Sequence, residues 1–288
     1  MSNAAQALAP PVRLDVRPVA GRIGAEIRGV TLSGELDAAT VEAIQAALVR
    51  HKVIFFRDQS HLDDQTQEAF AHLLGEPVAH PTVPSREGTR FLLELDGAEG
   101  RRANSWHTDV TFVEAYPKAS ILRSVVAPES GGDTVWANTA SAYADLPAEL
   151  RELADRLWAV HSNEYDYAGV KPSASLEQLE NYRKVFTSTV YETEHPLVRT
   201  HPESGRRVLF LSAHTEVEIP GYDPARGQAL IGRLREHLAR PELSYSHAWS
   251  VGDIVWWDNQ AVLHARNAFP ASERRRLKRI SLAGSRPF

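Results

Sequence analysis

Residues 120–137 read SILRSVVAPESGGDTVWA, and this stretch carries the pattern that dominates the second half of the chain. Ser120 to Val126 and Thr134 to Ala137 are short runs rich in β-branched and apolar side chains, which predicts two strands. Gly131-Gly132 between them predicts a turn, because glycine adopts the backbone conformations that tight turns require. The segment therefore predicts two strands joined by a turn.

The strand pattern recurs on both sides of this stretch, interrupted by segments with helical spacing. Further strands are expected at 21–27, 52–56, 91–95, 197–200, 208–211, 244–250, 253–257 and 277–282. Helices are expected at 37–50, with Asp37 as a cap, and at 63–74, about 147–158 and about 227–239. Many short strands with a few helices favour an antiparallel sandwich or barrel flanked by helices.

The chain of 288 residues is expected to form a single domain over 12–288, after a disordered Ala- and Pro-rich tail at 1–11. No internal repeat or low-complexity linker indicates a second domain. Residues 78–105 are expected to be mostly loop around one strand. Residues 163–190 are polar without a clean period, which is typical of a lid or a long loop.

Composition limits the classes of function. Apolar residues make up 43% and charged residues 24% of the chain, as in ordinary soluble globular proteins. No segment approaches the roughly 18 consecutive apolar residues of a membrane span, and the start does not resemble a secretory signal, so the cytoplasm is the expected location. The chain contains no cysteine, which excludes disulfides, thiolate zinc sites and iron–sulfur clusters. Any metal here must be held by nitrogen and oxygen ligands.

His107-Thr108-Asp109 is the first candidate for a metal site. It precedes Val110 to Val113, which is predicted to be a strand, and residues i and i+2 of an extended segment share one face. With His264, later in the chain, it supplies the two histidines and one carboxylate typical of non-haem Fe(II) oxygenases. An alternative stays open, because the chain has 12 histidines and most His-x-Asp pairs do not bind metal.

The basic run at 274–279, RRRLKR, stands out in a chain of net charge −5. On a strand Arg275, Leu277 and Arg279 share one face, while Ile280 lies on the other. Paired guanidinium groups beside a metal suit a dicarboxylate co-substrate or an anionic substrate, because the planar fork binds carboxylate with two hydrogen bonds. On charge alone, a solvated face or a nucleic-acid surface stays open, and the acidic total counts against nucleic acid.

Several ordered blocks together resemble the taurine dioxygenase family of 2-oxoglutarate-dependent oxygenases. The blocks are Trp106 to Phe112, Gly131 to Trp136, His195 to Pro202, Gly252 to Asn259, His264 and the arginine-bearing final strand. Their order and spacing agree with the family from about Ile23 to near the C-terminus. The resemblance implies a mainly β protein with flanking helices, built on a double-stranded β-helix (jelly-roll) core.

The same resemblance assigns roles to individual residues. It implies that His107, Asp109 and His264 hold Fe(II), and that Thr134 and Arg275 hold the distal carboxylate of 2-oxoglutarate. The substrate-side positions that it implies are His80, Val83, Ala103, Val110 and Arg279, with Arg279 meeting an anionic group of the substrate.

The implied activity is hydroxylation of a C–H bond of a small anionic substrate, with 2-oxoglutarate and O₂ consumed and succinate and CO₂ released. Residues 22–25, 51–57 and 136–140 look closest to the alkylsulfatase branch, so an alkyl sulfate or sulfonate is expected. Ala103 and Val83 replace a polar and an aromatic position of the taurine branch, which suggests a larger or more apolar substrate.

Alternative functions are the same chemistry on an aryloxyalkanoate or on a natural-product or amino-acid intermediate, and a non-catalytic, metal-dependent protein that binds a small molecule. A nucleic-acid-binding module that uses the basic run is a third reading. Under the favoured hypothesis of a 2-oxoglutarate-dependent oxygenase, we expect no nucleic-acid or membrane partner. We also expect a homo-oligomer, either a dimer or a tetramer.

Overall fold

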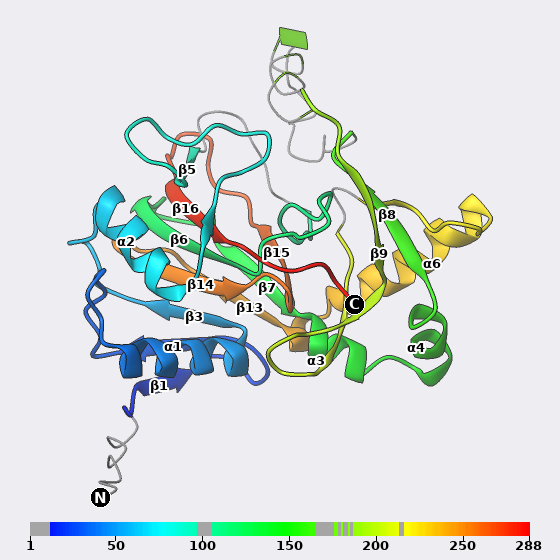
Figure 1. Ribbon diagram of the computed structural model, residues 1–288, viewed down its shortest axis with the longest axis horizontal. Coiled ribbons are helices and arrows are strands. Elements are labelled where there is room, and N and C mark those ends of the chain that lie inside the picture. Colours follow the sequence, from blue (N-terminus) through cyan, green and yellow to red (C-terminus); the bar gives the residue numbers. More distant parts are fainter. Residues whose placement is uncertain are drawn as a thin grey trace, which may run out of the picture.

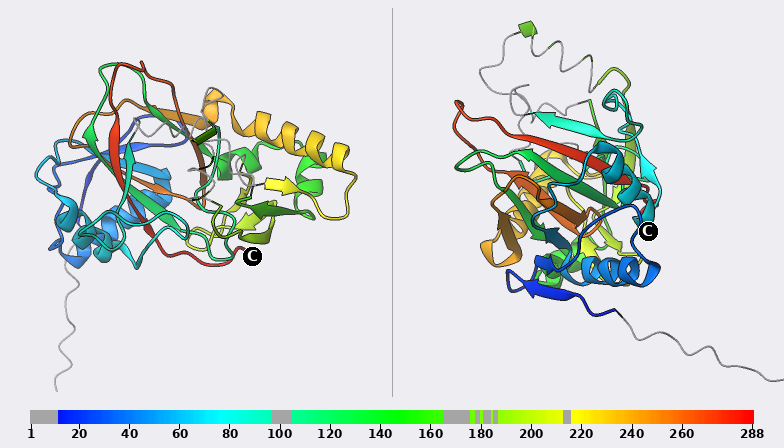
Figure 2. Two further views of the ribbon diagram at one scale, coloured as in Figure 1. Left: turned by 90° about the horizontal axis from the view of Figure 1, so that it is seen from above. Right: turned by 90° about the vertical axis from the view of Figure 1, so that its left-hand side faces the viewer.

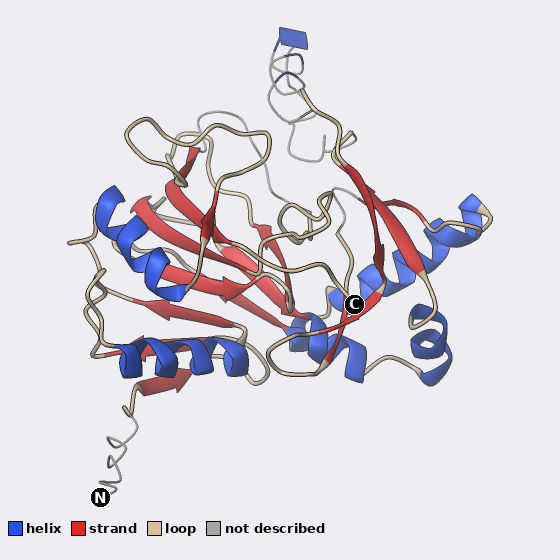
Figure 3. Ribbon diagram, in the orientation of Figure 1, coloured by secondary structure: helices blue, strands red, loops and turns tan. Residues whose placement is uncertain are grey.

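The structure is a computed structural model that describes residues 12–96, 105–164, 176–177, 180, 184, 187–212 and 216–288. Its centre is a pair of β-sheets with helices on the outside (Figures 1 and 3). The larger sheet runs in the spatial order β1 (Asp15–Pro18), β2 (Ala25–Arg28), β3 (Val53–Phe56), β14 (Ile254–Asp258), β6 (Ala119–Val126), β16 (Arg276–Leu282) and β4 (Pro77–Val78), with β5 (Leu93–Asp96) also paired to β16. The smaller sheet has the order β13 (Ser244–His247), β7 (Thr134–Asn138), β15 (Val262–Arg266). The predicted mainly β class with flanking helices is confirmed.

The apolar runs of the larger sheet form strands that are buried on both faces, which explains why they lack polar alternation. On β3, Val53 and Phe55 pack with Trp136 of β7 in the core between the two sheets. Ile54 and Phe56 face the other way, into a second core on the outer side of the sheet. The sheets therefore form two packed layers.

Two helices cover the outer face of the larger sheet. They are α1 (Ala38–His51) and α2 (Asp64–Leu74), and their apolar faces complete the second core. Asp37 caps α1 as predicted, since its side chain accepts a hydrogen bond from the backbone of Thr40 at 2.9 Å. A capping box between Asp63 and Thr66 begins α2.

The remaining elements form an outlying part beside the smaller sheet (Figure 2). They are α3 (Thr139–Ala144), α4 (Ala148–Ala154), β8 (Trp158–Ser162), β9 (Glu192–Pro196), β10 (Val198–Thr200), β11 (Arg207–Leu209), β12 (Glu216–Glu218), α6 (Pro224–Leu238) and η2 (Pro241–Leu243). They share their own apolar core, which includes Leu197, Leu209 and Leu234.

Several predicted boundaries are corrected. The helix expected at about 147–158 ends at Ala154, and Trp158 instead begins β8, whose partners β9 and β12 were not predicted. The strand expected at 244–250 ends at His247. The predicted tail at 1–11 lies outside the described residues. Within the part of the chain that is described, no helix combines the length and apolar character that a bilayer span would need.

Candidate active site

Two histidines from distant parts of the chain lie opposite each other in an isolated antiparallel bridge. The backbone N–H of His107 donates to the carbonyl of His264 at 2.9 Å, and the N–H of His264 donates to the carbonyl of His107 at 2.8 Å. Residues directly opposite in such a ladder project their side chains to the same face. The two imidazole centroids are accordingly 4.1 Å apart. The bridge fixes a loop histidine against one on β15.

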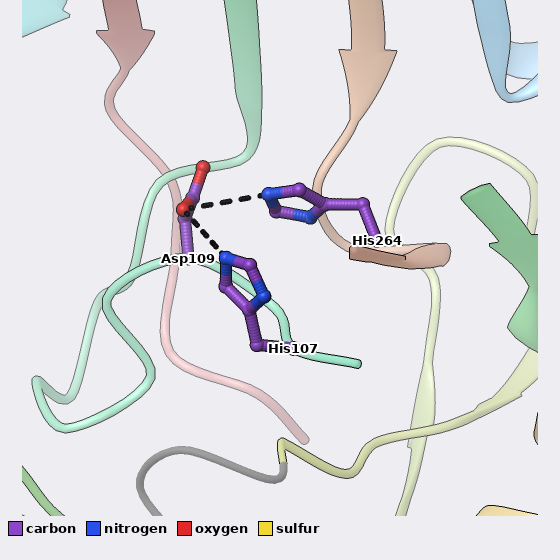
Figure 4. A group of neighbouring side chains, drawn as sticks. All are labelled: His107, Asp109 and His264. Atoms are coloured by element: carbon purple, nitrogen blue, oxygen red, sulfur yellow. Dashed lines mark ion pairs between the residues drawn. The ribbon is translucent and has the colours of Figure 1, made fainter. Parts of the chain in front are cut away.

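Asp109 completes the group. Its backbone N–H donates to Oδ1 of Asn259 at 3.0 Å, and Nδ2 of Asn259 donates to the carbonyl of Asp109 at 3.2 Å. Its Oδ1 lies 3.8 Å from Nε2 of His107 and 3.7 Å from Nε2 of His264. Figure 4 shows both imidazoles directed at this oxygen. The three candidate ligand atoms all lie within 4.8 Å of one another.

The chain turns directly after Asp109, so the prediction of a strand at 110–113 is wrong. Val110 has φ 59°, in the left-handed region that a β-branched residue seldom adopts. Beyond this turn the carbonyl of Thr111 accepts a hydrogen bond from Nε2 of His195 at 2.8 Å. Long-range hydrogen bonds have overridden the local β propensity here, as they commonly do.

Burial keeps both imidazoles neutral. It lowers the pKa of His264 to about 3 and lowers the pKa of His107 as well. Nδ1 of His107 lies 2.9 Å from the carbonyl oxygen of Ser105, which can only accept, so Nδ1 carries the proton and the Nε2 lone pair faces Asp109. Burial raises the pKa of Asp109, but the charge of Arg279 and the hydrogen bond from Ser120 outweigh it and hold that pKa below its usual range.

This donor set fits a divalent transition metal. Two neutral imidazoles and one ionised carboxylate are the three protein ligands of the non-haem Fe(II) oxygenase triad, which leaves positions for other ligands. Metal ligands must be deprotonated, and the three groups already meet that requirement. The structure therefore brings together the three residues that the sequence predicted as metal ligands, His107, Asp109 and His264.

A cavity of about 120 Å³ adjoins the two histidines. Thr134 begins β7 and Arg275 directly precedes β16, and Nη2 of Arg275 donates to Oγ1 of Thr134 at 3.0 Å. Nε1 of Trp249 donates to the same oxygen at 3.0 Å. The guanidinium carbon of Arg275 lies 5.7 Å from the centre of the Trp249 ring. The structure brings the predicted pair together and adds a tryptophan that the sequence did not indicate.

Thr134 and Arg275 retain bonding capacity that a carboxylate would use. The Thr134 oxygen accepts two hydrogen bonds, so its own proton is available to a third partner. Among the described residues, Nε of Arg275 is buried without a hydrogen-bond partner. Burial, and then the charge of Arg266, lowers the pKa of Arg275 to about 9. An anionic ligand would offset this buried positive charge.

Four of the five cations of the 274–279 run make side-chain contacts with other described residues. Within the described residues the partners are Asp96 for Arg274 at 2.6 Å, Thr134 for Arg275 at 3.0 Å, Asp64 for Lys278 at 2.6 Å and Asp109 for Arg279 at 2.6 Å. Arg275 and Arg279 line the cavity, whereas Ile280 packs in the core under the helices, so the predicted alternation is confirmed. Arg275, Lys278 and Arg279 are buried, so the solvated-face interpretation is wrong for these three cations, whereas Arg274 is exposed.

The structure describes some of the residues that were predicted to lie on the substrate side. Val83 and Val110 are buried. The ring of His80 lies 6.4 Å from that of Phe112, which in turn lies 6.0 Å from that of Tyr191. The rings of His80 and Tyr191 therefore lie on either side of Phe112, which belongs to the turn that follows Asp109.

Ala103 lies outside the described residues, so its predicted role has no structural counterpart here. Sequence reasoning missed the supporting roles of Trp249 and Asn259. Asn259 follows the apolar run of β14, within the block Gly252 to Asn259 that carried the family resemblance. An amide at the end of a buried strand could have indicated a residue that supports the site. Trp249 offers no such signal, because only the pairing of β13 with β7, which places His247 opposite Thr134, brings it to that residue.

Comparisons with known proteins agree with this geometry. The model of the family "Taurine catabolism dioxygenase TauD, TfdA family" matches residues 15–281. An α-ketoglutarate-dependent sulfate ester dioxygenase of Pseudomonas putida is 67% identical over 288 residues, covering 100% of this chain and 95% of that protein. An alkylsulfatase of Acinetobacter baylyi is 53% identical over 275 residues, covering 96% and 86%.

Solved structures show the same likeness. A taurine dioxygenase from Burkholderia xenovorans superimposes with a TM-score of 0.80 at 38% identity, covering 96% of this chain and 91% of that one. The structure of AAD-2 in complex with Mn(II) and N-oxalylglycine superimposes with a TM-score of 0.78 at 27% identity, covering 96% and 99%.

Proposed function

The chain belongs to the TauD, TfdA family and is a 2-oxoglutarate-dependent dioxygenase, and we propose that it oxidises the carbon next to the ester oxygen of an alkyl sulfate. The observation that carries the proposal is the buried triad of His107, Asp109 and His264 beside a cavity lined by arginines. The relatives named for sulfate esters and for alkylsulfatase activity support this substrate class. The jelly-roll core stays our proposal for the two packed sheets, and a dimer or tetramer stays a prediction.

In this proposal the triad holds Fe(II), which supplies the activation of O₂ when it is bound. Thr134 and Arg275 hold the distal carboxylate of 2-oxoglutarate and so direct its keto acid end toward His107 and His264. One oxygen atom of O₂ ends in succinate, with CO₂ released, and the other ends in a hydroxyl group on the substrate carbon. Because that carbon also bears the sulfate ester oxygen, the C–O bond then breaks, which gives an aldehyde and sulfate.

Arg279 is the residue that we propose for the sulfate group. Its Nη1 lies 2.6 Å from Oδ1 of Asp109, so its charge stands directly beside the triad. Arginine binds tetrahedral oxyanions with two parallel hydrogen bonds. The buried apolar side chains of Val83, Val110 and Phe112 would receive the alkyl chain.

The test is a turnover assay with Fe(II), 2-oxoglutarate and a panel of alkyl sulfates, taurine and aryloxyacetates. Succinate and sulfate should form in equal amounts with the alkyl sulfates, and His107→Ala should abolish both. Arg279→Gln should raise KM for the alkyl sulfate more than KM for 2-oxoglutarate. Turnover with aryloxyacetates alone would refute the substrate class and would favour the aryloxyalkanoate alternative.

A further inference from the structure

The turn after Asp109 is held from the outlying part of the protein as well as from the larger sheet. Thr111 is fully buried, and its carbonyl accepts a hydrogen bond from Nε2 of His195 on β9 at 2.8 Å. Its hydroxyl oxygen lies 3.0 Å from Nδ1 of His161 on β8. The paired strands β8 and β9 (Figure 1) therefore hold both the backbone and the side chain of Thr111.

The strand register explains how two histidines reach one residue. His195 lies opposite Ala159 in the ladder, and Ala159 is two residues before His161 on β8. Cross-strand partners share a face, and so do residues two apart on a strand, so both imidazoles project from one face. Their centroids are 5.2 Å apart, and the ring of Phe210 packs 5.0 Å from His195 and 5.3 Å from His161. This packing limits the movement of both imidazoles.

The residue between Asp109 and Thr111 has a conformation that costs free energy. Val110 has φ 59°, and a β-branched residue in the left-handed region is an outlier. Such strain persists only where the surrounding contacts hold the backbone in place. Asn259 binds the backbone of Asp109 before the strained residue, and His195 binds the carbonyl of Thr111 after it. Loss of either contact would let the turn relax and would move the Asp109 carboxylate away from the other two residues of the triad.

We propose that His195 and His161 are positioning residues that hold this turn in its strained conformation and thereby direct the carboxylate of Asp109 at the metal. Neither histidine belongs to the triad, and both act through Thr111. Burial lowers the pKa of both imidazoles, so they act as uncharged hydrogen-bonding groups. The inference rests on the proposed function, because that function places a metal on Asp109.

The experiment measures the Fe(II) dissociation constant by anaerobic calorimetry without co-substrate, and the free energy of unfolding in urea. His195→Phe keeps a ring beside Phe210 and removes the donor to Thr111, so it should weaken Fe(II) binding roughly tenfold, which corresponds to about 1.4 kcal/mol. His195→Gln should retain most of the affinity, because its amide N–H can donate to the same carbonyl. His237→Phe is the matched control and should leave Fe(II) binding unchanged. It also removes a contact between a histidine nitrogen and a carbonyl in the outlying part, to Ala142 at 2.9 Å.

A second substitution tests whether His195 acts through the strained turn. Glycine adopts positive φ without steric cost, so a turn that carries Val110→Gly needs no histidine to hold it. In that background His195→Phe should weaken Fe(II) binding roughly threefold or less, whereas a merely structural histidine would lower the affinity by the same factor in both backgrounds. Thr111→Val gives an independent measurement if His195→Phe does not fold, because it removes only the hydroxyl that contacts His161. It should weaken Fe(II) binding with Val110 in place and not with Val110→Gly.

The outcomes separate this positioning role from the proposed function. A tenfold loss in His195→Phe that Val110→Gly removes would support the role. Unchanged Fe(II) affinity in His195→Phe, an equal loss in His237→Phe, or the same factor in both backgrounds would overturn it. If the wild type bound no Fe(II), the proposed function itself would fail, and the positioning role with it.

Discussion

Trp249 offers the sharpest test of how the proposed co-substrate pocket is organised. Its Nε1 donates to Oγ1 of Thr134 at 3.0 Å, and Arg275 donates to the same oxygen at 3.0 Å. With both lone pairs occupied, the Thr134 hydroxyl must direct its proton at the ligand. Trp249→Phe removes one donor and keeps an aromatic ring beside Arg275.

The expected effect follows from the loss of one hydrogen bond between uncharged groups. Such a bond contributes about 1 kcal/mol, which corresponds to roughly fivefold weaker binding of 2-oxoglutarate. KM for 2-oxoglutarate should rise by that factor while KM for the sulfate ester stays unchanged. The smaller ring also leaves space in the core between the sheets, so the free energy of unfolding should fall by about 1–2 kcal/mol.

The assay measures both KM values by succinate release, together with urea unfolding. Trp158→Phe is the matched control, because Trp158 is 42% exposed whereas Trp249 is 7% exposed. Thr134→Val completes a double-mutant cycle. If Trp249 acts through the Thr134 hydroxyl, adding Trp249→Phe to Thr134→Val should cost almost nothing further. A further fivefold loss in the double variant, or an unchanged KM in the single one, would refute the reasoning.

Three other predictions follow from buried polar contacts. Burial lowers the pKa of His195 to about 4, so between pH 6.5 and 4 the unfolded chain binds a proton that the folded chain does not. As the pH falls through that window, the free energy of unfolding should decrease by up to about 3 kcal/mol. The free energy of unfolding of His195→Asn should depend less on pH over the same window. Asn259→Ala should weaken Fe(II) binding, measured by anaerobic titration, because it removes both amide contacts to the backbone of Asp109; unchanged affinity would contradict this. Lys278→Met should lower the urea midpoint by loss of its bond to Asp64 at 2.6 Å, while KM for 2-oxoglutarate stays at the wild-type value.

Elements with strong local signals were predictable. The helix begun by Asp37 and the apolar strand at 53–56 need only a cap and a run of buried side chains to be recognised. The alternation of 275–280 correctly assigned Arg275 and Arg279 to one face, because strand periodicity is a local property.

Elements defined by distant partners were not predictable in the same way. Val110 to Val113 has the composition of a strand, yet it turns at Val110, and the carbonyl of Thr111 bonds His195 from β9 instead of a ladder neighbour. The short strands β8 and β12 have few apolar alternations of their own and exist through pairing in one small sheet. Pairing energy of this kind appears only after the chain has closed long loops.

The candidate site shows most clearly which features the sequence predicts and which features require the tertiary structure. The sequence by itself predicted that a histidine–aspartate pair, a later histidine and two arginines on one strand face serve a metal and carboxylate chemistry. That prediction needed the resemblance of the ordered blocks to a family as well as residue type and local alternation, and it stays a proposal. Only the tertiary structure decided that His107 pairs with His264, that Trp249 meets Thr134, and that Arg266 faces the same cavity as Arg275. The physical reason is that each of these contacts comes from pairing between segments far apart in the chain, which no single segment encodes.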